Sequence, residues 1–177
     1  MESKKTAVFG IYPTVNAAEG AVDAIVHAGF DSGMVSVLIP SEESVADFGH
    51  EKHTKAPEGT AAGATTGGVL GGALGLMIGI GALAIPGLGP FIAAGPIMTT
   101  LAGVGVGGTV GGLVGALVGV GLPEYEARRY EGRLKEGGVL LSVHCDTADE
   151  IRRAKGLLTG TGATDIAAVG EAAVGSR

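Results

Sequence analysis

The sequence predicts an α+β fold into which a long helical hairpin is inserted. The 177-residue chain has 34 glycines, no tryptophan and a mean hydropathy of +0.41, so the packed residues are apolar but small. Charge is confined to the two ends, because Gly59 to Pro123 contains no Asp, Glu, Lys, Arg or His. We therefore expect three parts: residues 1–58, a glycine-rich helical hairpin at 59–122, and residues 123–177.

The N-terminal part is predicted to run strand, helix, strand and then a polar linker. The β-prone run Ala7–Tyr12 comes first. Apolar residues at helical spacing follow, with Thr14 as the expected N-cap and Gly29 as the stop. Val35–Ile39 is the second predicted strand, and Pro40 ends it.

The insert is predicted to form two helices with glycine at every fourth position. These glycines are Gly63, Gly67, Gly71, Gly75 and Gly79 in the first helix, and Gly103, Gly107, Gly111, Gly115 and Gly119 in the second. Small residues at this spacing let two helix backbones approach closely. Pro86, Gly87, Gly89 and Pro90 cannot continue a helix, so we expect the hairpin turn there, followed by a short separate turn at Phe91–Gly95.

The C-terminal part is predicted to repeat the first scheme after one extra helix. That helix begins at Pro123 and ends at Gly137. Strands at Val139–Cys145 and Ile166–Val169 then enclose a helix that opens on a Thr-x-x-Glu capping box at Thr147. Two βαβ halves of this kind can share a core as a ferredoxin-like βαββαβ domain, with both helices on one face and the hairpin inserted between strands 2 and 3.

The sequence is compatible with more than one environment for the hairpin. Thr60–Ile85 and Ile97–Leu122 are each long enough as helices to cross a hydrocarbon core of about 30 Å. Basic residues flank the pair on both sides, which places both termini in the cytoplasm if the hairpin spans a membrane. Such helices could equally be buried in a soluble homo-oligomer, whose apolar interior could hold lipid or another lipophile, or form an aggregation-prone segment.

Several kinds of chemistry are not expected. A net charge of −6 and a pI near 5.1 argue against a nucleic-acid partner, and the glycines form no phosphate-binding motif, which argues against a nucleotide or other cofactor. His50 and His53 have a spacing that could hold a metal, but a hydrated linker explains them as well. His144 and Cys145 point to opposite faces of a strand, so they form no nucleophile and base pair. We expect no catalytic residues, no metal and no enzyme.

The sequence resembles a known bacterial family. The resemblance rests on the opening strand Ala-Val-Phe-Gly-Ile-Tyr, the segment Gly79–Pro96 with its Pro-Gly-x-Gly-Pro turn, and the run Gly111–Leu117 that leads into Pro123. The chain resembles the general-stress or low-temperature-induced proteins with a glycine-zipper hairpin, and the resemblance covers nearly the whole chain. The resemblance implies a bacterial, stress-associated, cytoplasm-facing and non-enzymatic role, in a family whose members are often membrane proteins. Combined with the predicted hairpin, it leads us to expect a protein that self-assembles in or on the inner membrane, with a cytoplasmic ferredoxin-like domain.

Overall fold

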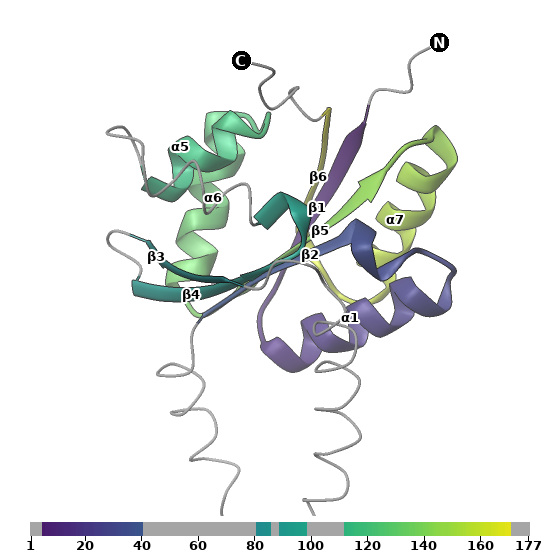
Figure 1. The fold of residues 1–177 in the computed structure, drawn as a ribbon, viewed down its shortest axis with the longest axis horizontal. Coiled ribbons are helices and arrows are strands. Elements are labelled where there is room, and N and C mark those ends of the chain that lie inside the picture. The colour runs from purple at the N-terminus through teal and green to yellow at the C-terminus, as the bar shows by residue number, and fades with distance from the viewer. Residues whose placement is uncertain (1–4, 41–80, 86–88, 99–111, 171–177) are drawn as a thin grey trace, which may run out of the picture.

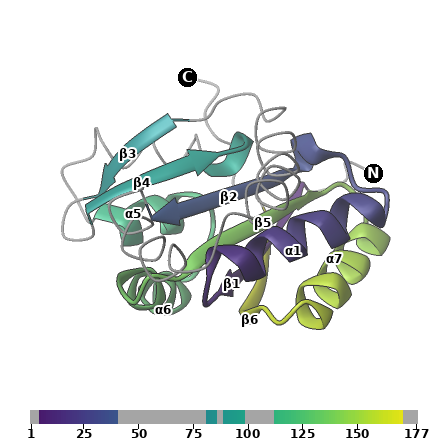
Figure 2. The same cartoon turned by 90° about the horizontal axis from the view of Figure 1, so that it is seen from below.

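Six strands form one antiparallel sheet in the computed structural model, which describes residues 5–40, 81–85, 89–98 and 112–170. The strands are β1 (Thr6–Tyr12), β2 (Val35–Pro40), β3 (Gly81–Ile85), β4 (Gly89–Ala94), β5 (Val139–Cys145) and β6 (Thr164–Gly170). Their order is β3-β4-β2-β5-β1-β6, so β3 and β6 lie at opposite ends of the sheet (Figure 2). The predicted α+β class is confirmed.

Helices cover both faces of the sheet (Figure 1). They are α1 (Val15–His27), α5 (Gly112–Gly119), α6 (Glu124–Lys135) and α7 (Ala148–Gly160), with a 3₁₀ turn, η1, at Ser32–Met34. One buried cluster joins α1 and α7 to the sheet, and a second joins α5 and α6 to its other face. Successive residues of β1 enter different clusters: Val8 packs under α1 and α7, and Phe9 under α5 and α6.

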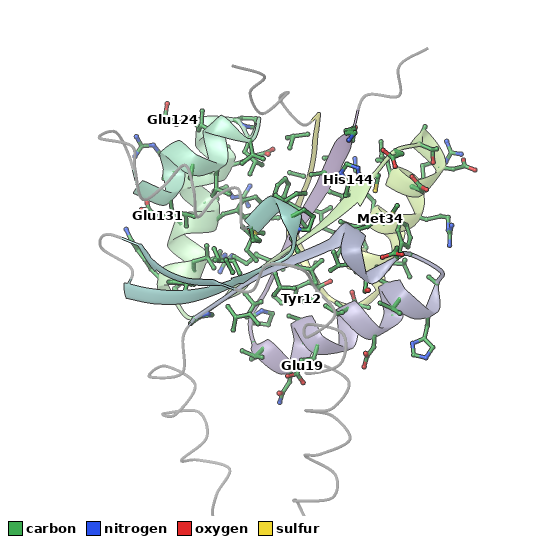
Figure 3. All side chains as sticks on the ribbon, viewed as in Figure 1. Tyr12, Glu19, Met34, Glu124, Glu131 and His144 are labelled. Atoms are coloured by element: carbon green, nitrogen blue, oxygen red, sulfur yellow. The ribbon has the colours of Figure 1, made fainter. Side chains whose placement is uncertain are left out.

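The start and stop signals in the sequence act where they were expected. The Thr14 hydroxyl accepts the backbone N–H of Ala17 at 3.2 Å, and Gly29 has a φ of +93° just after α1. Figure 3 shows Glu19 and Glu124 on the outer sides of α1 and α6, away from the sheet. The polar faces and the capped ends therefore fix which side of each helix is free to pack.

Glu150 gives this domain a pH dependence that can be measured. Its carboxylate accepts the backbone N–H groups of Asp146 at 2.8 Å and Thr147 at 3.0 Å, which holds the pKa of Glu150 below its ordinary value of 4.5. The stabilisation is therefore complete above about pH 4.5 and is lost as the pH falls through the lower folded-state value. In urea denaturation, wild type is expected to exceed Glu150→Gln in stability at pH 7, with the gap closing towards pH 3. A gap that stays constant with pH would contradict this expectation.

The predicted helical hairpin is wrong at residues 81–85 and 89–94, which form two strands. β3 occupies the end of the predicted first helix, and β4 occupies the predicted short turn at Phe91–Gly95. β4 pairs with β2, from Val37 opposite Ala94 to Pro40 opposite Phe91. The periodicity of a short apolar run fits a strand or a helix equally well. Here the main-chain N–H and C=O groups of β2 provide hydrogen-bond partners for β4, which favours the strand.

The predicted second helix, Ile97–Leu122, is not one continuous helix. α5 begins at Gly112, whose φ of +54° lies outside the right-handed helical region. Met98 and Leu122, near the two ends of the predicted helix, are buried in the same cluster on the same face of the sheet. Within the described ranges, no helix has the length and apolar character needed to cross a membrane.

Candidate functional site

α5 is the part of the glycine-striped insert that the structure describes as a helix, and one side of it is packed in the domain. All eight of its residues are apolar or glycine. Leu113, Ala116 and Leu117 are buried, at the spacing of one helix face, and Val120 continues the same row. This face packs onto α6 and the sheet. Leu113 and Leu117 of the insert therefore belong to the core of the domain.

The opposite side of α5 is the candidate functional site. Gly115 is partly exposed, Gly119 is exposed, and Val118 between them is 41% exposed. This outer face of α5 carries no polar side chain. A helix that is apolar all round is normally buried on every side, so the outer face is suited to another apolar surface. Gly115 and Gly119 are one turn apart, the arrangement that lets a second backbone come close.

The other predicted packing and turn residues divide into two groups. Gly63, Gly67, Gly71, Gly75, Gly79, Gly103, Gly107, Gly111, Pro86 and Gly87 lie outside the described residues. Gly89 and Pro90 begin β4, where they stand opposite Ile85 and Ala84 of β3. Gly89 and Pro90, which were predicted to lie in a turn between two helices, therefore belong to a strand.

A tight contact at Gly95 connects the end of β4 to β2, at a position where the sequence predicted only the end of a short turn. Gly95 has a φ of +91°. A β-carbon on it would lie 2.5 Å from the Oγ of Ser36 and 2.7 Å from the Ser36 Cα. The Ser36 hydroxyl accepts the backbone N–H of Ile97 at 3.1 Å. The Gly-Pro pair at 95–96 was the available signal, but it indicated only a break in a helix.

Ser36 and Ser142 stand opposite each other on β2 and β5, fully buried under α5 and α6. Ser142 Oγ has no hydrogen-bond partner among the described residues, whereas Ser36 Oγ has Ile97. A buried hydroxyl without a partner costs free energy, and removing a partner from a buried N–H costs it too. A serine flanked by apolar residues in each strand is the sequence signal for this pair.

The two serines are expected to respond to alanine in opposite directions. Ser142→Ala should raise the free energy of unfolding by about 1 kcal/mol, because an unpaired buried hydroxyl is removed. Ser36→Ala should lower it by about 1 to 2 kcal/mol, because the Ile97 N–H loses its acceptor. Urea denaturation of both variants measures this. Equal changes of the same sign would contradict the assignment.

Asp165 forms an ion-pair cluster where β6 begins. Its side chain is 11% exposed and contacts the guanidinium groups of Arg129 and Arg133 of α6. The Tyr130 hydroxyl donates to the Asp165 carbonyl, and burial, followed by the charges of Glu126 and Asp165, raises the Tyr130 pKa. The adjoining hollow of about 70 Å³ is well below the size of a metabolite pocket. The cluster fixes α6 against the start of β6.

The side chains of Cys145 and His144, which could in principle react, lie among residues of the folded domain. Cys145 is buried in the cluster under α1 and α7, where its thiol lies 3.6 Å from the Val143 carbonyl oxygen. His144, on the other face of β5, lies 3.3 Å from Asp146. The described part of the chain contains no group of three potential metal ligands, and His50 and His53 lie outside it.

Comparisons of the chain with protein-family models, with curated proteins and with solved structures find no match. The resemblance to glycine-zipper stress proteins therefore stays a prediction. The chain's own residues and their geometry are the basis for a functional proposal.

Proposed function

We propose that this protein is a non-enzymatic, self-assembling protein in which glycine-striped helices of different copies pack against one another. In this proposal it is a bacterial stress-associated protein, as the resemblance implies, and its assemblies form in or on the membrane with the folded domain in the cytoplasm. The single observation that carries the self-assembly is the outer face of α5, formed by Gly115, Val118 and Gly119.

The outer face of α5 favours a helix as its partner. Glycines at i and i+4 remove the side chains that would hold two backbones apart, so dispersion and weak Cα–H···O contacts become available. Val118 beside them adds apolar area that water solvates poorly. A copy of the same helix offers the same groove and ridge, so an isologous pair is self-complementary.

The domain that carries α5 is suited to a structural role. The strands β2-β5-β1-β6, with α1 and α7 on one face, support a ferredoxin-like unit, and β3 and β4 extend it beyond β2. Packed clusters cover both faces of the sheet, and the hollow at Asp165 is small. These features support a scaffold without catalysis.

Leucine at both outer glycines of α5 should break the assembly. Gly115→Leu with Gly119→Leu fills the groove between helices, so the mass of the assembly measured by light scattering is expected to fall below that of wild type. Leucine also favours helix over glycine, so α5 itself should persist. An unchanged mass would rule out this face as the contact.

A matched pair on another helix controls for the added leucines. Gly156 and Gly160 of α7 have the same spacing, are exposed, and have open space around an added β-carbon. Gly156→Leu with Gly160→Leu is expected to leave the mass of the assembly unchanged. Circular dichroism of both double variants verifies that the domain is folded before the masses are compared.

One observation favours the alternative of a soluble homo-oligomer, a shell or carrier with an apolar interior for a lipophile. The leucines of α5 are buried against the sheet of their own domain, which leaves fewer large apolar groups for lipid. Fractionation separates the two forms. Native protein that stays in the high-speed supernatant without detergent favours the soluble assembly, and protein that pellets with membranes and is released only by detergent favours insertion.

A further inference from the structure

The two βαβ halves of the domain repeat each other residue for residue over most of their length. β1 and β5 each have 7 residues, and α1 and α7 each have 13. The helix caps Thr14 and Thr147, and the left-handed glycines Gly29 (φ +93°) and Gly162 (φ +91°), occupy matching positions at the same interval along the chain. β1 and β5 pair antiparallel, so an approximate two-fold axis between them relates the halves.

The strand registers show which residues correspond across this axis. Phe9 and Ser142 occupy matching positions and lie opposite each other in the sheet. On the outer side of Ser142 stands Ser36 of β2, and on the outer side of Phe9 stands Ala167 of β6. β2 and β6 are therefore equivalent strands, and Ala168 corresponds to Val37.

The outer edges of these equivalent strands differ in whether a described strand pairs with them. The outer edge of β2 pairs with β4, beginning with Val37 opposite Ala94. The outer edge of β6 is paired with no strand in the part of the chain that the structure describes (Figure 2). An edge of the same geometry thus accepts an antiparallel strand in one half of the domain, while in the other half no described strand pairs with its N–H and C=O groups.

β6 lacks the features that normally protect an edge strand from pairing. Ile166 to Gly170 contains no charged residue and no proline. Asp165 precedes this stretch at a shift in the register with β1, and its charge is matched by Arg129 and Arg133 within the same chain. Within the described strand Thr164–Gly170, no unmatched charge is left to select a foreign partner of opposite sign.

We propose that β6 pairs antiparallel with β6 of a second copy of this chain, with the two-fold axis at Ala168. This register sets Ile166 opposite Gly170 and Ala167 opposite Val169, so every opposed pair within Ile166–Gly170 is apolar or glycine. The pairing joins two six-stranded sheets into one continuous sheet. It uses a different surface from the outer face of α5 and does not depend on the function proposed above.

Disulfide trapping tests the register directly. In an antiparallel self-pairing only the residue on the axis faces its own copy, at a Cα separation of about 4.5 to 5.5 Å, which a disulfide can bridge. In a Cys145→Ala background, Ala168→Cys is expected to give disulfide-linked dimer as the main species after mild oxidation. Ala167→Cys and Val169→Cys, which face each other, are expected to give little when introduced singly. Gly156→Cys, exposed on α7, is the matched control.

Absence of cross-linking at Ala168→Cys, or equal cross-linking at Gly156→Cys, would overturn the proposal. Mass measurement gives a second test: Val169→Lys puts a charge on the edge and is expected to lower the mass of the assembly, whereas Gly156→Lys is expected to leave it unchanged. If Val169→Lys does not fold, the trapping experiment alone decides. The Gly115→Leu and Gly119→Leu double variant should keep the Ala168→Cys cross-link, so failure of one self-association surface is distinguishable from failure of the other.

Discussion

Replacing Gly95 by alanine is expected to lower the free energy of unfolding by about 4 kcal/mol, enough to unfold much of the domain at ambient temperature. Two causes add. Gly95 has a φ of +91°, which an L side chain rarely adopts, and its β-carbon would overlap the Val35 carbonyl oxygen and lie 2.7 Å from the Ser36 Cα. Those backbone atoms belong to β2 and cannot move without disturbing the sheet.

Gly29→Ala separates the two causes. Gly29 has nearly the same φ, +93°, but an added β-carbon would meet no atom within 4 Å. Its substitution should therefore cost only the backbone strain, about 1 kcal/mol. Urea denaturation of both variants gives the comparison. Similar losses for Gly95→Ala and Gly29→Ala would mean that the close approach to β2 is not present in solution.

Leu117→Ala is expected to lower the free energy of unfolding by about 3 kcal/mol. Leu117 of α5 is 0% exposed in the cluster under the sheet, so truncation leaves a cavity among Leu113, Ala116 and the residues of α6. The result bears on function as well as stability, because it tests whether α5 is a helix of the folded domain or of a separate membrane hairpin.

Val118→Ala is the matched control on the same helix. Val118 is 41% exposed on the outer face of α5, so its truncation should change the free energy of unfolding by less than about 0.5 kcal/mol. The same variant should weaken self-association, since Val118 lies between Gly115 and Gly119. If Leu117→Ala cost no more than Val118→Ala, α5 would not be docked on the domain.

The two proposed contact surfaces have a combined consequence for assembly. The outer face of α5 and the edge of β6 each pair with their own copy, so each gives a two-fold contact. A chain with both can extend beyond a dimer, whereas loss of either surface leaves a dimer through the other. The α5 variant and the β6 variant are therefore each expected to have the mass of a dimer, and their combination the mass of one chain.

The sequence by itself determined the elements whose signals are local. Thr14 and Thr147 cap the N-termini of α1 and α7. Gly29 follows the end of α1 and Gly137 follows the end of α6, both with positive φ. The strand Val139–Cys145 has the predicted bounds. Each of these signals acts through hydrogen bonds or backbone sterics within a few residues, so one sequence is sufficient to read it.

Only the tertiary structure decided the state of the apolar insert where it is described. Gly81–Ile85 and Gly89–Ala94 have no strong local preference for one structure. They are strands because β4 pairs with the outer edge of β2 and β3 pairs with β4. The glycine spacing indicated a helix at α5, but which side packs inward depends on the sheet and α6, which receive Leu113 and Leu117 and leave Gly115 and Gly119 outside. Burial and edge pairing join residues far apart in the chain, and their free energies exceed the small differences in local propensity.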